Sequence, residues 1–218
     1  LAADIVAGDT AARAGRKNLI LNGSMQVAQR GTTAPSYVSS NGTYMTVDRW
    51  AGWASGGSYK IDHHVTAVAD LEQVNGRSNF LKFSINTGND NCGVRQMIED
   101  VRSIPSNSLI TLSFYAKGTV GRQVETAIQA NYGSGGSAQD TLADSDVLFT
   151  LSSEWTKHSV TVPYVNLAGK TIGGGSNIRV QFKQGENDSS TSAWEFDITG
   201  VQLELGSVAT DFEHRSYG

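Results

Sequence analysis

Acidic side chains are the most numerous groups in this sequence that could perform acid–base chemistry. The 218 residues include 21 Asp and Glu, but only two tight pairs, Glu99 with Asp100 and Asp144 with Asp146. Cleavage of a glycosidic bond needs two carboxyl groups at a suitable separation. Both pairs lie in polar surroundings that favour a solvated surface, and no GxSxG, HExxH, phosphate-loop or dinucleotide motif occurs. The sequence therefore predicts a protein that is not an enzyme and leaves a polysaccharide depolymerase as the weaker alternative.

Histidine and cysteine offer no metal site in the sequence. His63 and His64 are neighbours, so on a strand they point to opposite faces and cannot bind one ion together. His158 and His214 are isolated. The single cysteine, Cys92, excludes an intrachain disulfide and is expected to be a buried apolar residue.

Aromatic side chains are the better candidates for ligand contact, because their rings stack on the apolar faces of sugars. Trp53 lies beside Gly52, Ser55 and two further glycines, which favours exposure. Tyr59 and Tyr132 are the next candidates, and each aromatic residue could instead belong to the core. Three tryptophans lie in runs typical of the interior: Trp50, Trp155 and Trp194.

The elements that would position these side chains are strands. Apolar residues alternate with polar ones at residues 81–85, 112–116, 160–162 and 178–182, and loops rich in Gly, Asn and Ser separate these runs. A period of two without a strong helical stretch predicts an all-β, antiparallel sandwich. Residues 94–104 fit both helical and strand spacing, and the strands on either side favour a strand.

The last predicted strand changes its alternation part-way along. Trp194, Phe196 and Ile198 are even-numbered apolar residues, and the series then continues on odd numbers from Val201. One extra residue in a strand moves every later side chain to the other face. The sequence therefore predicts a β-bulge at Thr199–Gly200, where glycine suits the backbone.

The size and charge of the chain limit its organisation and its partners. Residues 1–17 are rich in Ala and charge, which predicts a linker or helical neck, and residues 18–218 fit one domain. The net charge of −4 without a basic stripe argues against nucleic acid. No apolar run approaches the ~20 residues of a membrane span, so membrane insertion is not expected. The chain starts with Leu1, which suggests a fragment of a longer protein.

Four segments, in order, resemble a known family. They are NLILNGSMQVAQRG (18–31), MTVDRWAGW (45–53), IEDVRSIPSNSLITLSFYAKG (98–118) and VQLELGSVATDFEHRSYG (201–218). Together they resemble the carbohydrate-binding-module-like jelly-roll domains of bacteriophage tail fibre and receptor-binding proteins. The resemblance spans residues 16–218 and is more specific for the family than for a ligand.

This resemblance implies a jelly roll that recognises the host at the tip of a virion. The expected ligand is a host cell-surface glycan, bound without cleavage. The expected assembly is a homotrimer that joins other virion tail proteins, with the neck aligning three chains. The alternative is a structural or trimerising domain that binds nothing itself.

The resemblance also raises the question of a calcium ion. Related sugar-binding jelly rolls often hold one near the first and last strands, with an acid just after the N-terminal Asn-Gly and an Asp in the last strand. Asp197 matches the second position, whereas the uncharged Ser24 stands at the first. Calcium takes six to eight oxygen ligands. The expectation is therefore no cofactor, or a structural calcium with Asp197 among its ligands.

Overall fold

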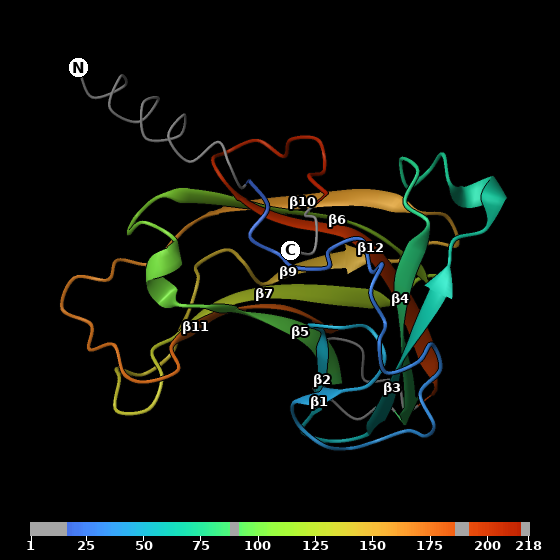
Figure 1. Cartoon of the computed structure of the whole chain (residues 1–218), viewed down its shortest axis with the longest axis horizontal. Helices are drawn as coiled ribbons and strands as arrows, with labels where there is room; N and C mark the ends of the chain where they lie inside the picture. Colours follow the sequence, from blue (N-terminus) through green and yellow to red (C-terminus); the bar gives the residue numbers. More distant parts are fainter. Residues whose placement is uncertain (1–16, 88–91, 186–191, 215–218) are drawn as a thin grey trace.

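The computed structural model describes residues 17–87, 92–185 and 192–214, and these residues form two stacked antiparallel sheets (Figure 1). The expected neck falls almost wholly outside the described residues. The strands are β1 Thr43–Tyr44, β2 Ala51–Ala54, β3 Ser58–Val65, β4 Asn79–Thr87, β5 Cys92–Glu99, β6 Leu109–Gly118, β7 Gln123–Asn131, β8 Asp140–Thr141, β9 Val147–Thr150, β10 Thr156–Pro163, β11 Asn177–Gln184 and β12 Trp194–Leu205. Two 3₁₀ turns, η1 Val68–Asp70 and η2 Val101–Ser103, accompany them.

The two sheets differ in width. The seven-stranded sheet has the order β1-β2-β5-β11-β7-β8, with β9 also paired to β7. The five-stranded sheet has the order β10-β6-β12-β4-β3. The predicted all-β, antiparallel jelly-roll sandwich is confirmed, and residues 94–104 form the end of β5 followed by η2.

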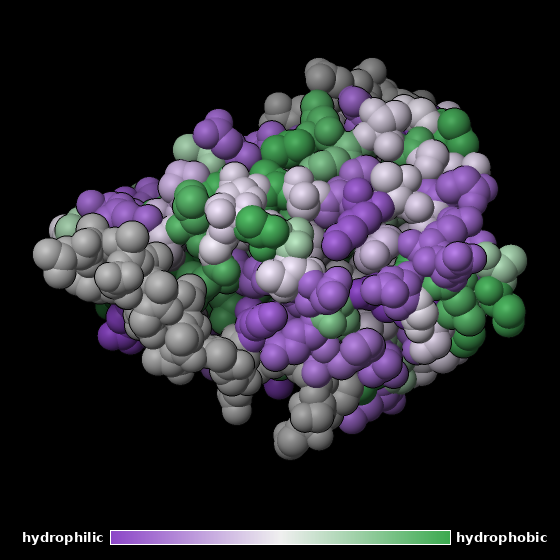
Figure 2. Space-filling view, turned by 90° about the horizontal axis from the view of Figure 1, so that it is seen from above, coloured by the Kyte–Doolittle hydropathy of each residue, from purple (hydrophilic) through white to green (hydrophobic). Residues whose placement is uncertain are grey.

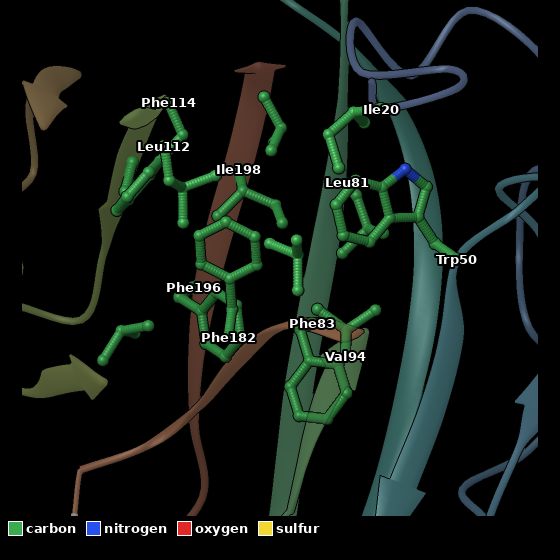
Figure 3. Packing of buried hydrophobic residues seen from close by; sticks show 14 of the residues in the cluster. Ile20, Trp50, Leu81, Phe83, Val94, Leu112, Phe114, Phe182, Phe196 and Ile198 are labelled. Atoms are coloured by element: carbon green, nitrogen blue, oxygen red, sulfur yellow. The ribbon is translucent and has the colours of Figure 1, made fainter. Parts of the chain in front are cut away.

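The core lies between the sheets and is rich in aromatic rings (Figure 3). Phe83 and Phe196 stack at 5.1 Å between ring centroids, and Phe114 meets Phe182 edge-on at 4.8 Å. Trp50 is fully buried and packs 6.1 Å from Phe182. Such rings each bury a large apolar area, which favours close association of the two sheets.

The change of alternation in β12 is a β-bulge, as predicted. Thr199 pairs with Tyr115 and Gln202 pairs with Ser113, so Gly200 and Val201 lie opposite one residue of β6. Gly200 has φ +62°. After the bulge, Val201 and Leu203 are fully buried, so one extra residue keeps the second half of the strand in register with the core.

The first described residues close the sandwich against its last strand. The backbone N–H of Leu19 donates to Leu203 O at 2.8 Å, and Val201 N–H donates to Gly23 O at 2.9 Å. The backbone N–H of Asn18 donates to Oε2 of Glu213 at 2.7 Å. The two ends of the domain are thus held together on β12.

The outward face of the five-stranded sheet is largely polar. Figure 2 looks down on this side of the molecule and shows hydrophilic side chains over much of it, with smaller apolar areas between them. In the described residues, no helix is long and apolar enough to span a membrane.

Candidate ligand-binding groove

The candidate site is the outward face of the seven-stranded sheet. Residues paired across antiparallel strands share a face, which places side chains in rows across the sheet. In one row, Trp53 on β2 pairs with Gly93 on β5, and Gly93 pairs with Lys183 on β11. In the next row, Arg95 pairs with Gln181, and Gln181 pairs with Ala127 on β7.

These rows form the floor of a groove of about 420 Å³. The small side chains in these rows, Gly93 and Ala127, leave a hollow above the sheet, and loop residues form its walls. Gln181 points outward from the sandwich but is only 5% exposed, so the walls shelter the floor. The lining residues are Asn41, Trp53, Ser55, Arg95, Ala127, Gln129, Thr141, Asp146, Gln181 and Lys183. Amide, hydroxyl and charged groups beside one large ring can donate and accept hydrogen bonds with the hydroxyls of a sugar.

Trp53 is the aromatic residue of this lining. Its side chain is half-buried, and its indole Nε1 is shielded from water yet has no hydrogen-bond partner among the described residues. An indole N–H is a donor that normally finds an acceptor when it is buried. Trp53 therefore offers a partly exposed ring surface at one side of the groove.

The basic side chains in the groove (Lys183 and Arg95) and beside it (Arg179) have different partners. Lys183 Nζ lies 2.7 Å from Glu125 Oε1, a pair that lies on the floor with Glu125 only 3% exposed. Arg95 donates from Nη2 to Asn41 Oδ1 at 2.8 Å, and Arg179 donates from Nη1 to Gln139 Oε1 at 2.9 Å. The lysine is thus neutralised by an acid, while the arginines are held by neutral amides.

The structure places Tyr59 and Tyr132, the other two predicted ligand contacts, in the interior and not at the groove. Both are fully buried. Tyr59 stacks on Phe83 at 5.2 Å on the core side of β3, where Gly52 leaves room for its ring. Tyr132 donates from its hydroxyl to Asp140 Oδ2 at 2.6 Å, and burial raises the pKa of its hydroxyl. Neither ring offers a face to a sugar, and of the three predicted contacts only Trp53 lies in the groove.

Asp197 does not fit the expected calcium site. It lies on the outward face of the five-stranded sheet, where it pairs with Lys82 on β4 and Lys117 on β6. Lys82 Nζ is 3.9 Å from Asp197 Oδ1, so a positively charged ammonium group already lies beside this carboxyl. Gly23, the neighbour of Ser24, accepts a hydrogen bond from Val201 N–H, and Val201 lies four residues beyond Asp197 on β12, past the bulge. The structure does not bring Ser24 and Asp197 together, and within the described residues no cluster of three metal-ligating side chains occurs.

The histidines and Cys92 stay outside the candidate site. His64 stacks on Phe80 at 5.3 Å, while the ring nitrogens of His63 are buried without a described partner. Burial raises the pKa of the Cys92 thiol to about 12, which keeps it protonated and unreactive at neutral pH.

No protein-family model and no curated protein sequence matches this chain. Solved structures with the same fold are a domain of bacteriophage CBA120 tailspike protein 4, described as enzymatically active, a cyclase from Fischerella sp. TAU, and the CBM22-2 xylan-binding domain of Xyn10C from Paenibacillus barcinonensis. The TM-scores are 0.53, 0.53 and 0.50, with identities of 14%, 11% and 12%. The matches cover 86%, 88% and 74% of this chain, and 21%, 98% and 94% of the other chains.

These similarities show the fold. The chain spans about a fifth of the tailspike polypeptide (21%), so that protein as a whole is much larger. Among these solved structures, one is a xylan-binding domain and one is a cyclase, so proteins of different function share this fold. The function must therefore be argued from the groove of this chain.

Sequence reasoning missed Arg95, which lines the groove, and Arg179, which lies beside it on the same sheet face as the lining residue Gln129. Each occupies the polar position of an alternating run, which indicates an outward side chain. Their strands are 84 residues apart in the chain yet adjacent in the sheet. Alternation shows that each arginine points outward, but it does not show which strands are neighbours.

Proposed function

We propose that this chain is a non-catalytic glycan-binding domain that binds its ligand in the groove of the seven-stranded sheet. The observation that carries the proposal is Trp53, a half-buried aromatic ring in the lining of an otherwise polar groove. A sugar ring has apolar faces that stack on an aromatic ring and hydroxyls that need donors and acceptors. Gln129, Gln181 and Thr141 supply such groups on the groove floor.

We further propose that the domain serves at the tip of a phage tail fibre and binds a host-surface glycan. The ordered sequence segments that resemble tail fibre domains support this location, as does the fold shared with a tailspike domain. The partners would be host glycan, two further copies of this chain and other virion tail proteins. A purely structural virion domain is the alternative, and it would leave the groove without a ligand.

The first experiment replaces the ring in the groove. Trp53→Ala should reduce binding to glycans extracted from candidate host envelopes by at least about tenfold, because stacking and burial of one aromatic ring contribute on the order of 1–3 kcal/mol. Tyr37→Ala is the matched control, since Tyr37 is 40% exposed and lies outside the groove lining. Circular dichroism should show both variants folded.

Three outcomes separate the alternatives. Binding that depends on Trp53 without release of reducing sugar supports the proposed function. Release of reducing sugar identifies a depolymerase, and then substitution of Asp146 on the groove wall is the next test. Wild-type protein that binds no host glycan at all favours the structural alternative.

A further inference from the structure

Arg95, which lines the groove, and Arg179, which lies on the same sheet face beside it, place two positive charges side by side. Arg95 on β5 pairs with Gln181 on β11, and Arg179 lies two residues before Gln181 on the same face. Diagonal neighbours of this kind in an antiparallel pair are about 7–8 Å apart at the backbone. Two guanidinium groups can therefore reach one small ligand group from adjacent strands.

The partners of both guanidinium groups are neutral. Arg95 donates to the amide oxygen of Asn41, and Arg179 donates from Nη1 to Gln139 and from Nε to Asn177 at 3.2 Å. Within the described ranges 17–87, 92–185 and 192–214, neither arginine forms an ion pair. These amide contacts orient the side chains without neutralising their charge.

The acids of the groove do not neutralise these arginines. Glu125 is paired with Lys183 at 2.7 Å. Asp146, on the wall, forms no ion pair with any basic side chain that the structure describes. The arginine pair is therefore a local excess of positive charge on a chain whose net charge is −4. Attraction of an anion to the groove would be a property of this site and not of the whole surface.

Because both arginines are partly buried, the absence of a negatively charged partner costs them free energy. Both arginines are half-buried, and Arg95 Nε is shielded from water without a hydrogen-bond acceptor. Burial lowers the pKa of both guanidinium groups, and the charge of Arg179 lowers that of Arg95 further. Arginine nevertheless stays charged at neutral pH. A ligand oxyanion would supply the negative charge that no described ion-pair partner gives these two guanidinium groups.

We propose that the groove binds an anionic glycan, with the acidic group of one sugar held between Arg95 and Arg179. This inference rests on the proposed glycan-binding function and names its ligand class. The fork of N–H donors on a guanidinium matches the two oxygens of a carboxylate or the oxygens of a sulfate or phosphate group. Arg95 follows Gly93, the partner of Trp53, by two residues, which is about 6.5–7 Å along the strand. A sugar ring on Trp53 can thus direct an acidic substituent toward the arginines.

The test compares each acidic glycan with a neutral form of the same chain. Calorimetric titration would use oligosaccharides of polygalacturonate, their carboxyl-reduced forms, and sulfated and phosphorylated dextran oligosaccharides with unmodified dextran. Wild type should bind at least one acidic form about tenfold or more tightly than its neutral counterpart. The preferred acid then identifies the oxyanion.

Arginine variants assign that preference to the site. Arg95→Gln and Arg179→Gln should each weaken binding of the acidic ligand by about tenfold or more, because hydrogen bonds to charged groups are among the stronger ones. The neutral form should lose clearly less affinity, so that the preference for the acidic form shrinks. Lys157→Gln is the matched control, since it removes one positive charge from an exposed position on β10 of the opposite sheet. Circular dichroism should show that all variants are folded.

Other results would overturn the inference. Equal affinity for acidic and neutral forms, lost together in Trp53→Ala, would keep the glycan-binding function and reject the anionic ligand. An equal loss of acidic binding in Lys157→Gln and the arginine variants would show diffuse attraction and reject the site. Binding to no member of any pair would reject both proposals.

Discussion

Asp197 shows at the scale of one residue how burial can outweigh a neighbouring opposite charge. Its Oδ1 is 3.9 Å from Lys82 Nζ, but Lys82 lies closer to Glu195, at 2.6 Å from Oε1. Asp197 is only 5% exposed, and Oδ1 has no hydrogen-bond partner in the described structure. Burial therefore raises the pKa of this carboxyl to about 7, against the opposing effects of Lys82 and Lys117.

Asp197→Asn should stabilise the protein progressively more, relative to wild type, as the pH rises from about 4 to about 7. In this window the folded carboxyl keeps a proton that the unfolded chain releases, so the stability of wild type falls as pH rises, by up to about 1.4 kcal/mol per pH unit. Asparagine cannot ionise and removes that loss. The measurement is urea denaturation of both proteins between pH 4 and pH 8.

Asp140→Asn is the control, because its effect on the free energy of unfolding should have the opposite sign. Hydrogen bonds from Lys170 and Tyr132 lower the pKa of Asp140, so Asp140→Asn should cost stability at neutral pH and less in acid. A difference between wild type and Asp197→Asn that stays constant across the pH range would show that Asp197 ionises normally in the fold.

The bulge of β12 is the decisive feature at the scale of elements. Without it, the residues after Thr199 would face the wrong side of the sheet. The outward side chains of the second half are also satisfied, because the segment after β12 folds back over them. Gln202 is fully buried there and accepts a hydrogen bond from Glu213 N–H at 2.8 Å. One glycine thus allows a single strand to contribute to the core along its whole length.

Gly200→Val should destabilise the fold by about 2 kcal/mol or more. A valine at φ +62° is strained, and its Cβ would lie 2.5 Å from Arg77 Nε and 3.1 Å from Tyr115 Cδ2. Arg77 is only 4% exposed and packs between the rings of Tyr115 and Phe212, so it has little space to move. Thermal unfolding followed by circular dichroism measures the loss.

Gly121→Val is the control that distinguishes backbone strain from steric crowding as the cause of the lost stability. Gly121 has φ +79°, but no atom lies within 4 Å of the position that its Cβ would take. This variant should lose stability through backbone strain alone, and therefore less than Gly200→Val. Equal melting temperatures for Gly200→Val and wild type would contradict the role assigned to the bulge.

At the scale of the whole molecule, alternation in the sequence was enough to predict the sandwich and the bulge. It succeeded because each strand has one buried face, as Leu81 and Phe83 show against Lys82. It was not enough for the site. Tyr59 lies in a polar, glycine-rich stretch but takes the core side of β3, and the groove depends on strands brought together by pairing across 84 residues. Local composition does not contain that information.

The assembly of three chains is the remaining whole-molecule prediction, and we expect it to depend on residues 1–17. The most exposed large apolar residues of the described body are valines at three places in the chain: Val65 with Val68, Val120, and Val208. Scattered apolar residues do not form an interface by themselves. Static light scattering of the full chain should give three times 23.2 kDa, and the chain 18–218 should give a smaller mass.

Trimerisation should also change polymer binding in a specific way. Three grooves on one particle bind a long glycan with an avidity about 10²–10⁴ above that of one groove. Removal of residues 1–17 should therefore weaken binding to a polysaccharide strongly and leave affinity for a short oligosaccharide unchanged, because the groove itself is intact. Surface plasmon resonance with immobilised polymer, compared with calorimetry on the oligosaccharide, measures the two effects. A monomeric mass for the full chain at high concentration, or equal polymer binding by both chains, would contradict the trimer.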